Sequence, residues 1–112
     1  EGIAQTVDAA SADVVTFATT AGRSYSVLAF IVGRTAARDT VGALLARGFK
    51  NVTGTLTALG ALTTVSNTAD AAVAASVIGL SVTGTSIRMQ ATGVAGQTIN
   101  WAADLQFKEY AP

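Results

Sequence analysis

The chain has 112 residues, and although half of them are hydrophobic, only seven are aromatic and much of the remainder is Ala and Val. Seven basic residues balance seven acidic ones, which disfavours nucleic-acid binding because contacts to phosphates need a basic excess. The absence of cysteine excludes disulfides and thiolate sites. The longest aliphatic runs are shorter than the roughly 20 residues of a membrane span, so we expect a soluble protein with no membrane insertion.

The first elements in the chain are expected to be β-strands. Alternating residues predict two weaker strands, over Ile3 to Val7 and Asp13 to Thr19. The next segment, Ser24 to Arg34, is apolar on both faces. One face carries Tyr25, Val27, Ala29 and Ile31, and the other carries Leu28, Phe30 and Val32. Because such strands are covered on both sides, we expect it to lie at the centre of a sandwich or to place its outer face, with Leu28, Phe30 and Val32, at a subunit interface.

The middle of the chain predicts two strands joined by a tight turn. They are expected over Gly42 to Val52 and Thr55 to Val65, around Asn51-Val52-Thr53-Gly54. Threonines occupy one parity of the second strand and apolar residues the other, which is typical of a strand with one solvent-facing side. The following segment, Ala71 to Leu80, is ambiguous, because its alanines suit a helix whereas its valines and isoleucine suit a strand. We predict a strand there.

The C-terminal end carries the clearest period-two pattern. The segments Ser86 to Thr92 and Ile99 to Lys108 both alternate apolar and polar residues, and Gly93 to Gly96 lies between them. This spacing predicts a β-hairpin. Trp101 shares its parity with the apolar residues of its strand, so we place it in the core in preference to a sugar-stacking surface.

About eight short strands at regular spacing predict an all-β fold, an antiparallel β-sandwich that is jelly-roll-like. No repeat or linker interrupts the sequence, so we assign one domain over residues 1–112. The chain begins with Glu1 and has no initiator methionine. We therefore expect the domain to be part of a longer polypeptide.

The residues that common enzyme mechanisms need are missing. Without histidine or cysteine there is no Ser-His-Asp triad and no usual zinc site. The phosphate-binding patterns G-x-x-x-x-G-K-[ST] and G-x-G-x-x-G do not occur, and the acidic residues are scattered with no close pair for glycoside cleavage. We therefore predict no enzyme activity, no catalytic residue, no cofactor and no metal.

Most basic residues occur in the first half of the chain. They are Arg23, Arg34, Arg38, Arg47 and Lys50. One interpretation is a patch for an anionic glycan or a neighbouring subunit, with Arg34, Arg38 and Arg47 as candidate ligand or partner contacts. The other interpretation is solvated strand edges, where charge deters edge-to-edge pairing. Arg34 is treated separately, because it ends an apolar strand and is expected to have a partner carboxylate.

Three segments together resemble a known family. They are Thr83 to Ala103, which contains T-G-V-A-G-Q-T-I-N-W, Ser24 to Arg34, and Phe49 to Leu59. They are similar to the C-terminal module of bacteriophage tail-fibre and related virion proteins, which ends with a strand, a TG-x-x-G-x-TI-x-W hairpin and a final strand. The resemblance implies a β-sandwich that trimerises and sits on the virion, and it implies no catalytic residues.

We therefore expect a non-catalytic structural and adhesion module of a phage tail fibre or appendage, located in the extracellular phage particle. It would be a homotrimer that contacts other virion proteins or a host surface glycan. The alanine-rich core agrees with oligomerisation, because Ala and Gly bury little area each. One alternative is a capsid-surface decoration protein. Another is a carbohydrate-binding module of a bacterial enzyme, which an exposed aromatic platform would favour.

Overall fold

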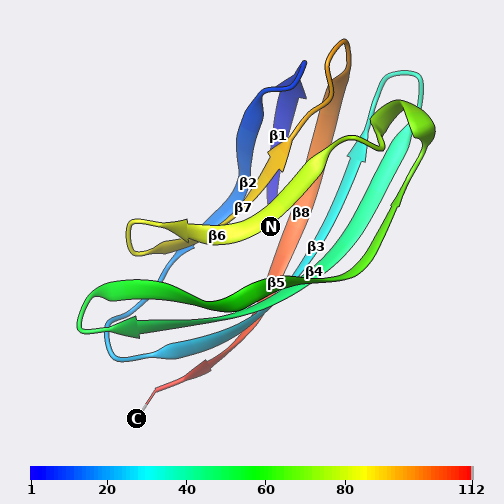
Figure 1. Ribbon diagram of the computed structural model, residues 1–112. Helices are drawn as coiled ribbons and strands as arrows, with labels where there is room; N and C mark the ends of the chain where they lie inside the picture. Colours follow the sequence, from blue (N-terminus) through cyan, green and yellow to red (C-terminus); the bar gives the residue numbers. More distant parts are fainter. Residues whose placement is uncertain (112) are drawn as a thin grey trace.

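The protein is a sandwich of two antiparallel β-sheets. A computed structural model describes residues 1–111, and Figure 1 shows the smaller sheet lying across one face of the larger one. The strands are β1 (Gly2–Val7), β2 (Ser11–Ala18), β3 (Ser24–Arg34), β4 (Thr40–Val52), β5 (Thr55–Ala69), β6 (Val77–Thr83), β7 (Ser86–Thr92) and β8 (Thr98–Tyr110). The larger sheet has the order β1-β8-β3-β4-β5 and the smaller one β2-β7-β6. The predicted all-β sandwich is confirmed.

Early strands pair with late ones. β1 and β3 both pair with β8, and β2 pairs with β7, all antiparallel. This nesting of the two ends of the sequence is a feature of jelly rolls. This arrangement does not extend to β4 and β5. These two strands continue the larger sheet from β3 as a meander and do not cross to the smaller sheet.

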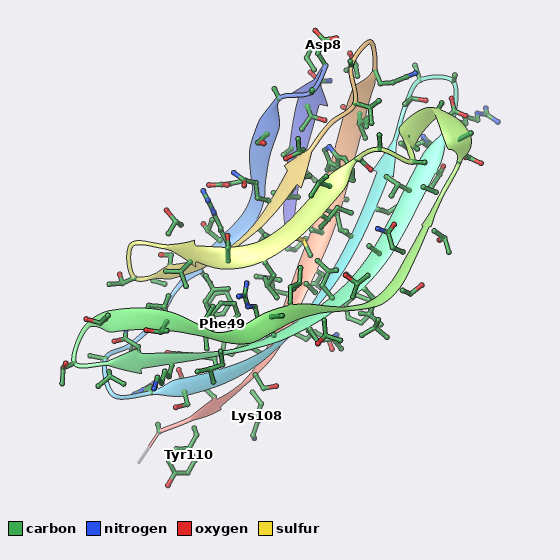
Figure 2. All side chains as sticks on the ribbon, viewed as in Figure 1. Asp8, Phe49, Lys108 and Tyr110 are labelled. Carbon is green, nitrogen blue, oxygen red and sulfur yellow. The ribbon has the colours of Figure 1, made fainter. Side chains whose placement is uncertain are left out.

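The core lies between the two sheets and follows the alternation of the strands. Along β3, residues from Tyr25 to Ile31 at odd positions are buried, whereas their even-numbered neighbours are exposed or half-buried. The largest fully buried side chains include Trp101, Phe49, Leu45, Leu80, Ile87, Met89 and Ile99. Figure 2 shows Phe49 in the space between the layers. The prediction that Trp101 belongs to the core is confirmed.

The predicted β4–β5 hairpin is confirmed. Its two turn residues, Thr53 and Gly54, have φ angles of 50° and 91°, as a type I′ turn requires. The Asn51 carboxamide oxygen supports the turn by accepting the N–H of Gly54 at 2.9 Å. β5 extends further than expected, to Ala69, and its register with β4 shifts twice.

The predicted C-terminal hairpin is wrong. β7 pairs with β2 and β6 in the smaller sheet, whereas β8 pairs with β1 and β3 in the larger one. Residues 93–97 therefore cross from one layer to the other, at the end of the molecule where Figure 1 also shows the β1–β2 and β3–β4 connections. Alternation and a short Gly-rich spacer occur both in hairpins and at corners where the chain changes sheet. The pattern therefore does not identify a strand's pairing partner.

The predicted strand over Ala71 to Leu80 is correct only in its second half. Ala71–Val73 forms a single 3-10 turn, and β6 begins at Val77. Val73 is fully buried, and its carbonyl accepts the Ser76 hydroxyl at 2.8 Å, which bends the chain as it passes from the larger sheet to the smaller one. Within residues 1–111, no helix has the length and apolar character needed to cross a bilayer.

Candidate interaction surface

The larger sheet has an outer face that the smaller sheet does not cover. One parity of β3, β4 and β8 lies on this face, and the other parity packs into the core. On the outer face, Phe30 of β3 lies between Leu44 of β4 and Asp104 of β8, and Val32 lies next to Ala102. Side chains from neighbouring strands therefore form one continuous surface.

This surface has an apolar centre, which we call the apolar patch. It consists of Ile3, Leu28, Phe30, Val32, Leu44 and Ala102. Phe30 and Val32 are 41% and 47% exposed, and Ile3 is 82% exposed. A shallow cavity of about 340 Å³ opens among Phe30, Val32, Ile3 and Ala102. A contiguous apolar surface on a small domain is typical of an interaction site.

The apolar patch contains all three residues proposed from the sequence as a subunit interface, Leu28, Phe30 and Val32. β3 does lie at the centre of its sheet, since it pairs with both β4 and β8. Its inner face packs on the core, but within a single chain nothing among residues 1–111 covers its outer face. The central position of β3 in its sheet is therefore confirmed, and the subunit interface at its outer face stays a prediction.

The basic residues of the first half of the chain do not form one patch. Arg23 pairs with Glu109, with 2.9 Å between Nη1 and Oε1. Arg47 turns inward, where Nη1 and Nη2 donate to the carbonyls of Leu80 and Gly60 at 2.9 Å and 2.7 Å. Arg47 thereby links the two sheets through both terminal nitrogens of its guanidinium, whereas its buried Nε has no partner among residues 1–111.

Arg34 and Arg38 are both exposed and line an open cavity of about 920 Å³ at one end of the outer face. The prediction that Arg34 has a partner carboxylate is wrong, because Arg34 makes no ion pair with any residue from 1 to 111. Its cross-strand neighbours are Thr40 and Asn100, which carry no charge.

The acidic residues are dispersed over the molecule. Asp13 lies 3.6 Å from the Arg88 guanidinium, and Asp104 lies 3.5 Å from the amino group of Glu1. In the part of the chain that the structure describes, no three acidic residues converge on a point where they could hold a metal ion.

Trp101 does not supply a sugar-stacking platform. It is 2% exposed, and its Nε1 donates to Oγ1 of Thr6 at 2.9 Å inside the core. Among the exposed aromatic residues, Phe107 stacks on Phe17 with ring centroids 4.6 Å apart, so one of its faces is already covered.

The T-G-x-x-G-x-T-I-x-W motif has structural roles. A Cβ on Gly93 would meet the Asp8 carbonyl and the Thr6 side chain, so the backbone approaches β1 closely here. Gly96 has a φ of 78°, and its N–H donates to the Asp8 carboxylate at 2.9 Å. Together with the Trp101–Thr6 hydrogen bond, these contacts hold residues 93–97, which connect the two sheets, against the end of β1. The motif therefore marks a corner of the fold.

Comparisons with family models, with curated proteins and with solved structures found no match to this chain. The resemblance to tail-fibre modules is therefore carried by the sequence segments alone. The fold and its surface define a β-sandwich with one open, apolar sheet face, and the function is argued from that face.

Two residues of this face were missed from the sequence. They join this face because β8 inserts between β1 and β3, which places Asn100 opposite Arg34 of β3 and Ile3 opposite Ala102 of β8. Alternation along β8 marks Asn100 as solvent-facing, but the order of strands in the sheet was needed to find its neighbours.

Proposed function

We propose that the chain is a non-catalytic structural and adhesion module of a phage tail fibre or related virion appendage, and that it acts as a homotrimer. The apolar patch carries the proposal. In a single copy Leu28, Phe30 and Val32 remain in contact with water, and burying them against another copy contributes roughly 25 cal/mol per Å². The number three rests on the resemblance to tail-fibre modules, and a closed ring of three requires a heterologous interface.

The residue chemistry supports a binding role. The chain has no imidazole and no thiol, and its acidic residues are dispersed, so nucleophilic and paired-carboxylate mechanisms lack their groups. A module of this kind acts by holding other virion proteins or a host surface glycan. Repeated copies on one particle multiply weak contacts into useful avidity.

Light scattering on the whole chain at micromolar concentration tests the oligomer. We expect a trimer mass for the unchanged chain and a lower mass for Phe30→Asp, because a carboxylate at the centre of the apolar patch would be desolvated in the interface. Thr57→Asp is the matched control, because it adds the same charge at an exposed position of β5 opposite Lys50. A stable monomer whose Phe30→Asp variant is equally soluble and equally stable would contradict the proposed interface.

The location of the chain on the phage particle is tested separately. Antibodies raised against the chain, used in electron microscopy of the phage that encodes it, are expected to label the tail or its fibres. Labelling of the head would assign the chain to capsid decoration, and particles that carry none of the chain would end the virion proposal.

A further inference from the structure

The larger cavity on the outer face has the size of a ligand site. Its volume of about 920 Å³ falls in the range of small-molecule pockets. It is built where β1, β3 and β8 lie side by side and where the β3–β4 loop, residues 35–39, closes one end. The lining residues on which binding depends are Ile3, Arg34, Thr35, Arg38 and Asn100.

The two arginines of this cavity have no side-chain partner among residues 1–111. The chain has five arginines. Arg23 and Arg88 pair with carboxylates, and Arg47 donates to two backbone carbonyls. Arg34 and Arg38 have neither kind of partner among residues 1–111, and no acidic residue lines their cavity. Two cations beside one opening create a local field that favours an anion.

Arg38 has a strained backbone conformation, which hydrogen bonds within the β3–β4 loop maintain. Its φ is 72°, a left-handed conformation that costs an arginine of the order of 1 kcal/mol. The Arg38 N–H donates to the Thr35 carbonyl at 2.9 Å, and the Arg38 carbonyl accepts the Thr40 hydroxyl at 3.0 Å. The Thr35 hydroxyl, in a side chain that is almost fully buried, accepts the N–H of Asp39 at 3.1 Å. The loop is thus fixed before any ligand arrives.

The rest of the cavity combines one amide with an apolar floor. The Asn100 side-chain oxygen accepts a hydrogen bond from Gln5 Nε2 at 2.9 Å, which orients the amide and leaves its Nδ2 donors without a partner in residues 1–111. Ile3, on the edge strand β1 and outside the proposed interface of Leu28, Phe30 and Val32, supplies exposed aliphatic surface next to it. A ligand that fits must therefore present an anionic group, hydrogen-bond acceptors and an apolar face within one small unit.

We infer that this cavity binds an acidic sugar residue, whose carboxylate lies between Arg34 and Arg38 and whose ring lies over Ile3. A pyranose carries hydroxyls at its edge and C–H groups on its face, which matches Asn100 on one side and the aliphatic side chain of Ile3 on the other. Guanidinium groups bind carboxylates through paired, charge-assisted hydrogen bonds. The inference rests on the proposed adhesion function, because it names the class of glycan that the module holds.

Binding to the whole chain is measured by NMR titration with matched sugar pairs. The first pair is 3′-sialyllactose and lactose, and the second is trigalacturonic acid and its methyl ester. We expect the acidic member of at least one pair to bind with a dissociation constant at least tenfold lower than that of its neutral counterpart, and to bind more weakly as salt is added.

Variants then locate the site. Arg34→Gln and Arg38→Asn should each weaken binding of the acidic sugar by roughly tenfold, the size expected for losing a charged hydrogen bond; Asn is chosen at position 38 because it tolerates positive φ. Lys50→Gln is the matched control, since it removes one positive charge from the opposite end of β4 and should leave binding unchanged. Thermal scans confirm that each variant is folded.

Three results would overturn the inference. The first is that neither acidic sugar binds better than its neutral counterpart. The second is that inorganic phosphate or a short poly-glutamate peptide competes as well as the sugar, which would show a general anion site. The third is that Arg34→Gln lowers the mass of the oligomer, which would assign these arginines to a contact between copies. The first two leave the trimer and the particle labelling intact, so they are distinguishable from failure of the proposed function.

Discussion

Trp101 of β8 donates its indole N–H to the hydroxyl of Thr6 on β1, with 2.9 Å between Nε1 and Oγ1. Both side chains are almost completely buried. A buried indole N–H without an acceptor is costly, so the hydroxyl at position 6 fixes the ring in one orientation. The bond ties the edge strand β1 to the centre of the core.

Trp101→Ala should therefore lower the free energy of unfolding by about 3–5 kcal/mol, because it empties a large volume in the core. Urea unfolding followed by circular dichroism measures the change. Thr6→Val, which keeps the volume and removes only the acceptor, should cost about 1–3 kcal/mol. An unchanged midpoint for Trp101→Ala would mean that the indole is exposed, and would restore a sugar-stacking role for it.

Gly33→Ala should destabilise the protein by about 1–3 kcal/mol, because overpacked cores respond on this scale. A Cβ at position 33 would lie 2.5 Å from two ring carbons of Trp101. Gly42→Ala is the matched control on the neighbouring strand, where the nearest atom to a new Cβ is the Thr68 hydroxyl oxygen at 4.0 Å. Equal melting temperatures for the two variants would disprove the close approach of Gly33 to the indole.

Arg47→Met should lower the free energy of unfolding by about 2 kcal/mol or more, since the carbonyls of Leu80 and Gly60 lose a charged donor. Arg47→Lys should recover only part of this, because an ammonium group lacks the planar fork that reaches both carbonyls. Chemical denaturation measures the free energy of unfolding of both variants, and Lys50→Met at an exposed position is the reference. A cost for Arg47→Met no larger than that for Lys50→Met would show that the link between the sheets contributes nothing.

Thr53→Asn should stabilise the protein by roughly 1 kcal/mol. Thr53 has a φ of 50°, which is unfavourable for a β-branched residue, and Asn-Gly is the preferred pair in a type I′ turn. The measurement is the midpoint of urea unfolding, compared with Thr55→Asn at the adjacent exposed strand position. A loss of stability at position 53 would mean that the Thr53 hydroxyl, which donates to the Val52 carbonyl at 2.8 Å, outweighs the backbone strain.

The chain should release no new reducing ends from a panel of bacterial surface polysaccharides. Histidine and cysteine are absent, and Asp13 and Glu109 are paired with arginines. A reducing-sugar assay over long incubation makes the test. Turnover that disappears when a single aspartate is changed to asparagine would contradict the proposed non-catalytic function.

Local pattern was enough to find most of the strands and the β4–β5 hairpin, but not the other pairings. The alternation that placed Trp101 in the core and Phe30 on the outer face depends only on which face of a strand meets the core. Pairing depends on contacts distant in sequence, and the segments on either side of residues 93–97 gave no sign that they join different sheets. The 3-10 turn illustrates the same limit. The Val73 N–H donates to the Asp70 carbonyl at 3.0 Å there, in a turn that is needed only to carry the chain between layers.

The candidate cavity was accessible from the sequence only in part. Arg34 and Arg38 were singled out by their charge, and both line it. Ile3 and Asn100 join them through the insertion of β8, which no local signal predicts. The hydrogen bonds of Arg47 to backbone carbonyls could not be predicted from the sequence either, because a solvated arginine and a half-buried one have the same sequence context here.

The pairing of β1 with β8 has a consequence for how the chain is made. A ribosome delivers β1 first and β8 last of the eight strands, yet β8 is the strand that joins β1 to β3. During synthesis the β3–β4–β5 meander can form, but β1 has no sheet to enter until the final strand has emerged, and contacts so distant in sequence form slowly. Until β8 has been synthesised, Thr6 therefore lacks its hydrogen bond from Trp101. A truncation that removes β8 also leaves β1 without a neighbouring strand in the sheet.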